Sequence, residues 1–172
     1  GSGPKPERLT RAEPGVSHVP ESWSRDGRWL LYSIKKDDTF SLMMLPLPGG
    51  QPMPFDNVRS LEPIGATFSP DDLWVAYAWT EAQAPNRGLP NRGVVIQPFP
   101  PTGAIYQVPR EYRDFHPAWG ATSSELFYIP TATRLSLVSV ETNPTPRFGK
   151  PVNLPRPATR RDRGDRCPRS PS

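Results

Sequence analysis

The chain has 172 residues, 35% of them hydrophobic, with 25 prolines, a single cysteine and a formal net charge of +4. This length suits one domain of ordinary size, and a lone cysteine excludes an internal disulfide or a cysteine-based zinc cluster. No apolar run is long enough to span a membrane, and the prolines between short apolar runs are typical of turns between strands.

A ten-residue pattern occurs three times along the chain. It covers residues 23–32, 68–77 and 119–128, and each copy begins with Trp or Phe and ends with Tyr. The copies start at positions 23, 68 and 119, which are 45 and 51 residues apart. Periods of this length are typical of repeat architectures built from one supersecondary unit per repeat.

Each repeat predicts four short strands. The first ends at the leading aromatic, and residues 24–27 (Ser-Arg-Asp-Gly) form a tight turn in which Asp26 accepts backbone N–H groups and Gly27 tolerates positive φ. The apolar run 29–32 then returns as the second strand. Further apolar runs predict the third strands (42–47, 94–99, 135–140) and the fourth (near 53–55, 106–108 and 151–154).

The repeats divide the chain into five parts. Residues 18–60, 61–112 and 113–154 are expected to form one four-stranded blade each. Residues 5–10 match only a fourth strand, so residues 1–17 are interpreted as the end of a preceding blade and a linker. Residues 155–172 hold six arginines and two aspartates, which is the whole net charge, and are predicted to be a disordered tail. Nucleic-acid or anionic-lipid binding by this tail, and an origin outside the native reading frame, are alternatives.

The pattern Trp-Ser-x-Asp-Gly-x-Trp-Leu-Leu-Tyr at residues 23–32 resembles the TolB/PD40 class of WD40-like propeller repeats. Residues 125–128, 138–142 and 147–152 are similar to the last blades of propellers attached to bacterial serine/threonine kinases. The resemblance implies an all-β fold, a β-propeller fragment of three blades, and an extracytoplasmic or periplasmic location. The chain departs from the pattern at Asp72, which replaces the turn glycine, in the third turn, which lacks Asp-Gly, and in an insertion at 81–92.

Catalytic motifs are absent from the sequence. There is no Gly-x-Ser-x-Gly nucleophile elbow and no phosphate-binding loop, so no enzyme activity, catalytic residue or cofactor is expected in this chain. Asp26 and Asp71 are interpreted as caps of their own turns rather than as paired catalytic carboxylates. His18 and His116 precede the first strands of repeats one and three, near the expected central channel, and are candidate ligands for an ion or small molecule.

Aromatic residues supply the remaining candidates. The six that begin and end the repeats are predicted to pack blade on blade: Trp23, Tyr32, Phe68, Tyr77, Trp119 and Tyr128. Three flanking tryptophans, Trp29, Trp74 and Trp79, are candidates for a peptide-binding face, with burial between blades as the alternative.

The preferred hypothesis is a non-catalytic binding scaffold that recognises a protein, a peptide or a cell-wall component. Its expected context is the sensor region of a bacterial serine/threonine kinase, with the remaining blades of a parent propeller as further partners. The alternative is the accessory propeller of a prolyl-oligopeptidase-like hydrolase. A nucleic-acid partner is not expected, because the residues before the tail are electrically balanced.

Overall fold

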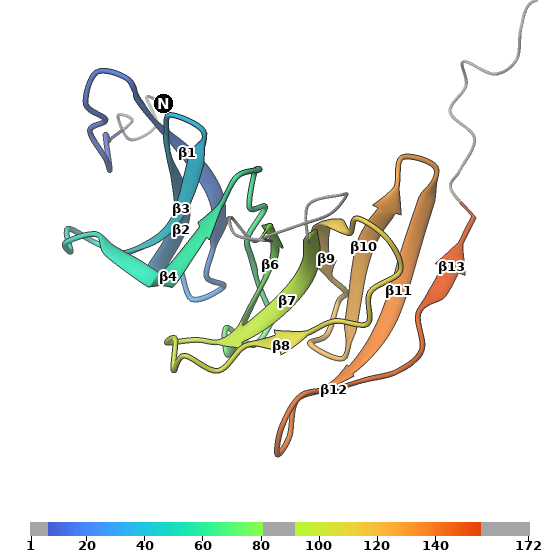
Figure 1. The fold of residues 1–172 in the computed structure, drawn as a ribbon. Coiled ribbons are helices and arrows are strands. Elements are labelled where there is room, and N and C mark those ends of the chain that lie inside the picture. Colours follow the sequence, from blue (N-terminus) through green and yellow to red (C-terminus); the bar gives the residue numbers. More distant parts are fainter. Residues whose placement is uncertain (1–6, 81–91, 156–172) are drawn as a thin grey trace, which may run out of the picture.

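The computed structural model describes residues 7–80 and 92–155. Within these ranges the chain contains strands, turns and loops but no helix, so no helix there could cross a membrane. The strands form three antiparallel sheets that stand side by side (Figure 1). The predicted all-β class and three-bladed organisation are confirmed.

The strands follow chain order within each sheet. Blade 1 comprises β1 (Val16–Trp23), β2 (Trp29–Lys36), β3 (Thr39–Pro46) and β4 (Met53–Ser60). Blade 2 comprises β5 (Thr67–Phe68), β6 (Trp74–Thr80), β7 (Arg92–Pro98) and β8 (Tyr106–Gln107). Blade 3 comprises β9 (Phe115–Trp119), β10 (Glu125–Thr131), β11 (Arg134–Glu141), β12 (Arg147–Phe148) and β13 (Val152–Leu154), the last two both pairing with β11.

The strand register repeats the sequence repeat. Trp29 is paired with Pro46 in blade 1, and Trp74 is paired with Pro98 at the equivalent place in blade 2. The first strand begins at Val16, two residues before the predicted start of the first repeat. Residues 7–10 form no strand. The tail with Cys167 and most of the insertion, residues 81–91, lie outside the described residues.

Two apolar cores lie between the blades. The first joins Leu31, Leu42 and Phe55 of blade 1 to Val75, Tyr77 and Val95 of blade 2. The second joins Ala76, Val94 and Ile96 of blade 2 to Leu126, Tyr128 and Val138 of blade 3. Because successive side chains of a strand point to opposite faces, β6 contributes to both cores, which explains why its sequence is continuously apolar.

The tyrosine that ends each repeat is buried. The Tyr77 hydroxyl donates to Oε1 of Gln97 at 2.6 Å, and Nε2 of Gln97 donates to Oδ2 of Asp56 in blade 1 at 3.0 Å. The Tyr128 hydroxyl donates to the carbonyl of Pro109, in the segment that follows blade 2, at 3.2 Å. The second and third tyrosines therefore tie their blade to the chain preceding it, and the predicted burial of all three is confirmed.

Candidate functional site

The first strands of the blades, β1, β5 and β9, lie next to one another. Side chains of β1 satisfy the backbone of blade 2 here. Oε2 of Glu21 accepts the N–H of Ala66 at 3.1 Å, and Oγ of Ser22 accepts the N–H of Phe68 at 3.2 Å. These bonds occupy donors on the free edge of β5, so the edge is closed by the neighbouring blade rather than left open.

Glu21 is a partly buried carboxylate within this contact. Burial raises its pKa above the ordinary value of 4.5, and hydrogen bonds from the Ser33 hydroxyl and from the N–H groups of Ala66 and Gly65 partly offset that rise. The group links two strands of blade 1 to the start of blade 2. The hydrogen bonds of Glu21 therefore hold the two blades together.

The turns that follow β1 and β5 have the same hydrogen-bond pattern. In the first, the Ser24 hydroxyl donates to Oδ1 of Asp26 at 2.6 Å, and the same oxygen accepts the N–H of Arg28 at 2.9 Å. In the second, the Ser69 hydroxyl donates to Oδ1 of Asp71 at 2.6 Å, and that oxygen accepts the N–H of Leu73 at 3.1 Å. The predicted turn-capping role of both aspartates is confirmed.

The pKa values of the capping carboxylates agree with this role. Hydrogen bonds from the Ser24 hydroxyl and from the N–H and guanidinium of Arg28 lower the pKa of Asp26 to about 2. Burial acts to raise the pKa of Asp71, but hydrogen bonds from the Ser69 and Ser123 hydroxyls and the Leu73 N–H leave it below its ordinary value. Both groups are held as carboxylates, which does not suit a general acid.

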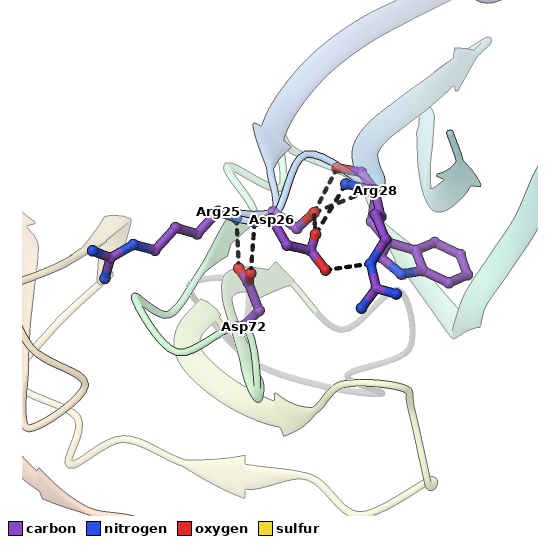
Figure 2. Close-up of polar contacts among 6 residues, drawn as sticks. Arg25, Asp26, Arg28 and Asp72 are labelled. Atoms are coloured by element: carbon purple, nitrogen blue, oxygen red, sulfur yellow. Dashed lines mark hydrogen bonds and ion pairs between the residues drawn. The ribbon is translucent and has the colours of Figure 1, made fainter. Parts of the chain in front are cut away.

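Asp72 joins the two turns. Its backbone has a φ of 57°, the left-handed conformation that Gly27 adopts at the equivalent place in blade 1 with a φ of 72°. Its Oδ1 accepts the N–H of Arg25 at 2.8 Å and its Oδ2 accepts the N–H of Asp26 at 3.1 Å (Figure 2). The residue that departs from the repeat pattern thus carries a contact between blades that glycine would lack.

Beside these turns lies a cleft of about 480 Å³. The aromatic residues that begin the three repeats all line it: Trp23, Phe68 and Trp119. The rest of its wall comes from the three first strands and the turns after them, and comprises Arg25, Thr67, Ser69, Pro70, Asp72, Ala118, Gly120 and Ala121. All three blades contribute to the cleft.

The aromatic residues differ in exposure along the cleft. Trp23 is 54% exposed, Trp119 is half-buried and Phe68 is buried at 6%. The Nε1–H of Trp119 donates to the carbonyl of Thr67 at 3.3 Å, which fixes this indole between blades 2 and 3. The prediction that Trp23 belongs to the core is wrong. Phe68 also packs on Phe99 and lies between blades on both sides, whereas Trp23 is in the first blade of this chain.

The three tryptophans predicted as a peptide-binding face lie elsewhere and are half-buried. Trp29 packs edge-on against Phe99 at 5.2 Å between ring centroids, and Trp74 packs edge-on against Tyr106 at 5.9 Å. The Nε1–H of Trp79 donates to the carbonyl of Arg59 at 3.1 Å. All three pack against the cores between blades, which matches the alternative of burial, and their role in binding stays a prediction.

The two histidines do not form one site with the aromatic cleft. His18 lies within β1, and its ring packs against that of Tyr32 at 5.3 Å. His116 is exposed in β9 and has a φ of 48°. They belong to blades 1 and 3, with blade 2 between them, and residues 7–80 and 92–155 contain no group of three or more His, Cys, Asp or Glu side chains that could hold a metal ion.

The arrangement of sheets is that of a TolB-like β-propeller. Among solved structures, the chain is similar to a putative TolB from Agrobacterium tumefaciens, with a TM-score of 0.58 and 11% identity over 82% of this chain and 50% of the other. It is similar to TolB from Acinetobacter baumannii, with a TM-score of 0.57 and 17% identity over 87% of this chain and 34% of that one.

A prolyl endopeptidase structure gives a TM-score of 0.62 and 13% identity over 80% of this chain and 22% of the other. This chain therefore spans half or less of the length of these neighbours. No protein-family model and no curated protein sequence matches it. At these identities the likeness shows the fold.

Proposed function

We propose that this chain is a non-catalytic β-propeller scaffold that recognises a protein or peptide through the cleft lined by Trp23, Phe68 and Trp119. The observation that carries the proposal is the convergence of these three aromatic side chains, one from each blade, on a single cleft in which Trp23 is 54% exposed. Exposed tryptophans in clefts are typical anchors of protein interfaces.

The roles of the carboxylates in the described part of the cleft support a scaffold rather than an enzyme. The carboxylates beside the cleft, Asp26, Asp71 and Asp72, are each engaged in hydrogen bonds that organise turns. Among the hydrogen bonds of the described residues none of them pairs with a histidine, and the Ser24 and Ser69 hydroxyls that donate to Asp26 and Asp71 also accept backbone N–H groups of the same turns. The site therefore favours binding without turnover.

The context we propose is the sensor region of a bacterial serine/threonine kinase, on the resemblance of residues 125–128, 138–142 and 147–152 to kinase-associated propellers. The second candidate is the accessory propeller of a prolyl-oligopeptidase-like hydrolase, favoured by the TM-score of 0.62 with a prolyl endopeptidase. The two proposed contexts predict different domains in the gene that encodes this chain. A kinase domain upstream supports the first, and an α/β-hydrolase domain downstream supports the second.

A selection from a phage-displayed library of random peptides tests the binding function. We expect the full chain to enrich peptides that bind wild type and lose binding to Trp23→Ala. Tyr112→Ala is the matched control, because Tyr112 is 59% exposed and does not line the cleft. Enriched peptides that bind Trp23→Ala as well as wild type would contradict the proposed site.

A further inference from the structure

Most polar side chains that line the cleft already form hydrogen bonds within the protein. The Ser69 hydroxyl donates to Asp71 and accepts the N–H of Trp74 at 3.0 Å. Both carboxylate oxygens of Asp72 accept backbone N–H groups. The exposed ring of Trp23 and the remaining exposed part of the half-buried Trp119 ring, and little else among these groups, are therefore left for a ligand.

Arg25 is the exception. Its backbone N–H binds Asp72, but its side chain extends away from that carboxylate (Figure 2). Its guanidinium makes one long hydrogen bond, from Nη1 to the Pro70 carbonyl at 3.4 Å, and forms no salt bridge with a carboxylate of the described residues. Its neighbour Arg28, in contrast, forms a salt bridge with Asp26 at 2.6 Å. Arg25 thus brings to an aromatic cleft, which the Asp72 carboxylate also lines, a guanidinium that forms no salt bridge with a carboxylate of the described residues.

We propose that the cleft binds an extended peptide in which a proline or aromatic residue lies next to an aspartate or glutamate. The apolar ring packs on Trp23 and Trp119, and the carboxylate pairs with Arg25. This inference rests on the proposed binding function and names its ligand class. Arginine suits the acidic group because its planar donors match a carboxylate.

The same observations disfavour a sugar chain as the ligand. A saccharide that stacks on indole rings also presents several hydroxyl groups, and each must replace its lost water with a protein partner. The Ser69 and Asp72 side chains are engaged internally, and the Thr67 hydroxyl is directed to the carbonyl of Phe68 at 3.4 Å. A peptide with one acidic group and an apolar ring makes smaller demands on hydrogen bonding.

Fluorescence anisotropy on the full chain tests the inference. The probes are fluorescein-labelled Pro-Pro-Glu-Pro-Pro, the same peptide with Gln in place of Glu, and labelled oligogalacturonate as an acidic saccharide. We expect the Glu peptide to bind about fivefold more tightly than the Gln peptide at low ionic strength, and the difference to shrink in high salt. Arg25→Gln should remove the preference, Arg25→Lys should restore part of it, and Trp23→Ala should weaken both peptides.

Arg28→Gln is the matched control, because Arg28 is exposed in the same turn and does not line the cleft. It should leave the preference intact. The acidic specificity is overturned if the two peptides bind equally or if Arg25→Gln leaves the preference unchanged. In that case, library peptides that depend on Trp23 would still support the binding function. Tighter, Trp23-dependent binding of oligogalacturonate than of either peptide overturns the peptide class. Failure of all three probes to bind also overturns this inference.

Discussion

The carboxylate of Asp72 in blade 2 accepts the backbone N–H of Arg25 in blade 1 at 2.8 Å, so a side chain of one turn completes the hydrogen bonding of the preceding one (Figure 2). The same carboxylate accepts the N–H of Asp26. The contact holds Arg25 at the rim of the aromatic cleft. The geometry of the candidate site therefore depends on a residue that the repeat pattern marks as a departure.

Substitutions at Asp72 distinguish the contribution of its carboxylate hydrogen bonds to stability from that of its positive φ. Asp72→Ala should lower the free energy of unfolding by about 1–2 kcal/mol, because it removes both acceptors and places alanine at a φ of 57°, a conformation that aspartate tolerates better. Asp72→Gly removes the acceptors but suits that φ, so its loss should be smaller, and Asp72→Asn keeps one acceptor oxygen. Urea unfolding of the three variants measures the order. Equal stability of wild type and Asp72→Ala would show that the contact between turns contributes nothing.

Substitutions at Tyr77 and Asp71 compare how much a buried aromatic side chain and a turn cap contribute to the free energy of unfolding. Tyr77→Ala should cost about 3–5 kcal/mol, because it empties a buried site that packs on Phe55 and breaks the hydrogen bond to Gln97. Asp71→Asn should cost about 1 kcal/mol or less, since an amide oxygen still accepts from the turn. Thermal or urea unfolding gives both values. A stable Asp71→Asn that loses a catalytic activity would instead indicate an acid–base role.

The sequence allowed the blades to be predicted because propeller strands repeat local chemistry. The burial of Tyr32, Tyr77 and Tyr128 follows from their equivalent places in apolar strands. The exposure of Trp23 did not follow, since it depends on which blades lie on each side of a given repeat. The convergence of Trp23, Phe68 and Trp119 on one cleft could have been found, because equivalent positions on first strands meet at the inner side of a propeller. The bond from Asp72 to Arg25 could not, because it joins residues 47 apart through a substituted turn position.

Glu21 predicts a defined pH dependence. Its pKa in the folded chain is raised above 4.5, so the folded state favours the protonated form relative to the unfolded chain. The resulting stabilisation is complete below the unfolded pKa and is lost as pH rises through the folded pKa. The stability of wild type relative to Glu21→Gln should therefore fall between about pH 4 and about pH 7.

Urea unfolding of wild type and Glu21→Gln at both pH values measures that difference. Glu141→Gln serves as the control, because Glu141 is exposed on β11. Its stability relative to wild type should change less with pH than that of Glu21→Gln. A relative stability of Glu21→Gln that is constant with pH, or that changes in the opposite direction, would show that burial does not dominate at Glu21.

The outer face of blade 3 predicts self-association of the isolated chain. Val152 is paired with Leu137, and Leu137 with Phe127, on the side of the sheet opposite to the buried Leu126 and Val138. Val152 is 56% exposed and the other two residues are half-buried. Contiguous exposed apolar surface drives association, so the mean mass of wild type should rise with concentration in size-exclusion chromatography with light scattering.

Val152→Lys should shift the chain toward monomer, because a charged side chain resists burial in a contact. Ile105→Lys is the matched control, since Ile105 is 51% exposed in the loop before β8 and should leave association unchanged. A wild-type chain that is monomeric at every concentration and binds no dye specific for apolar surface would contradict this prediction. It would show that the face is stable in water without a second sheet to cover it.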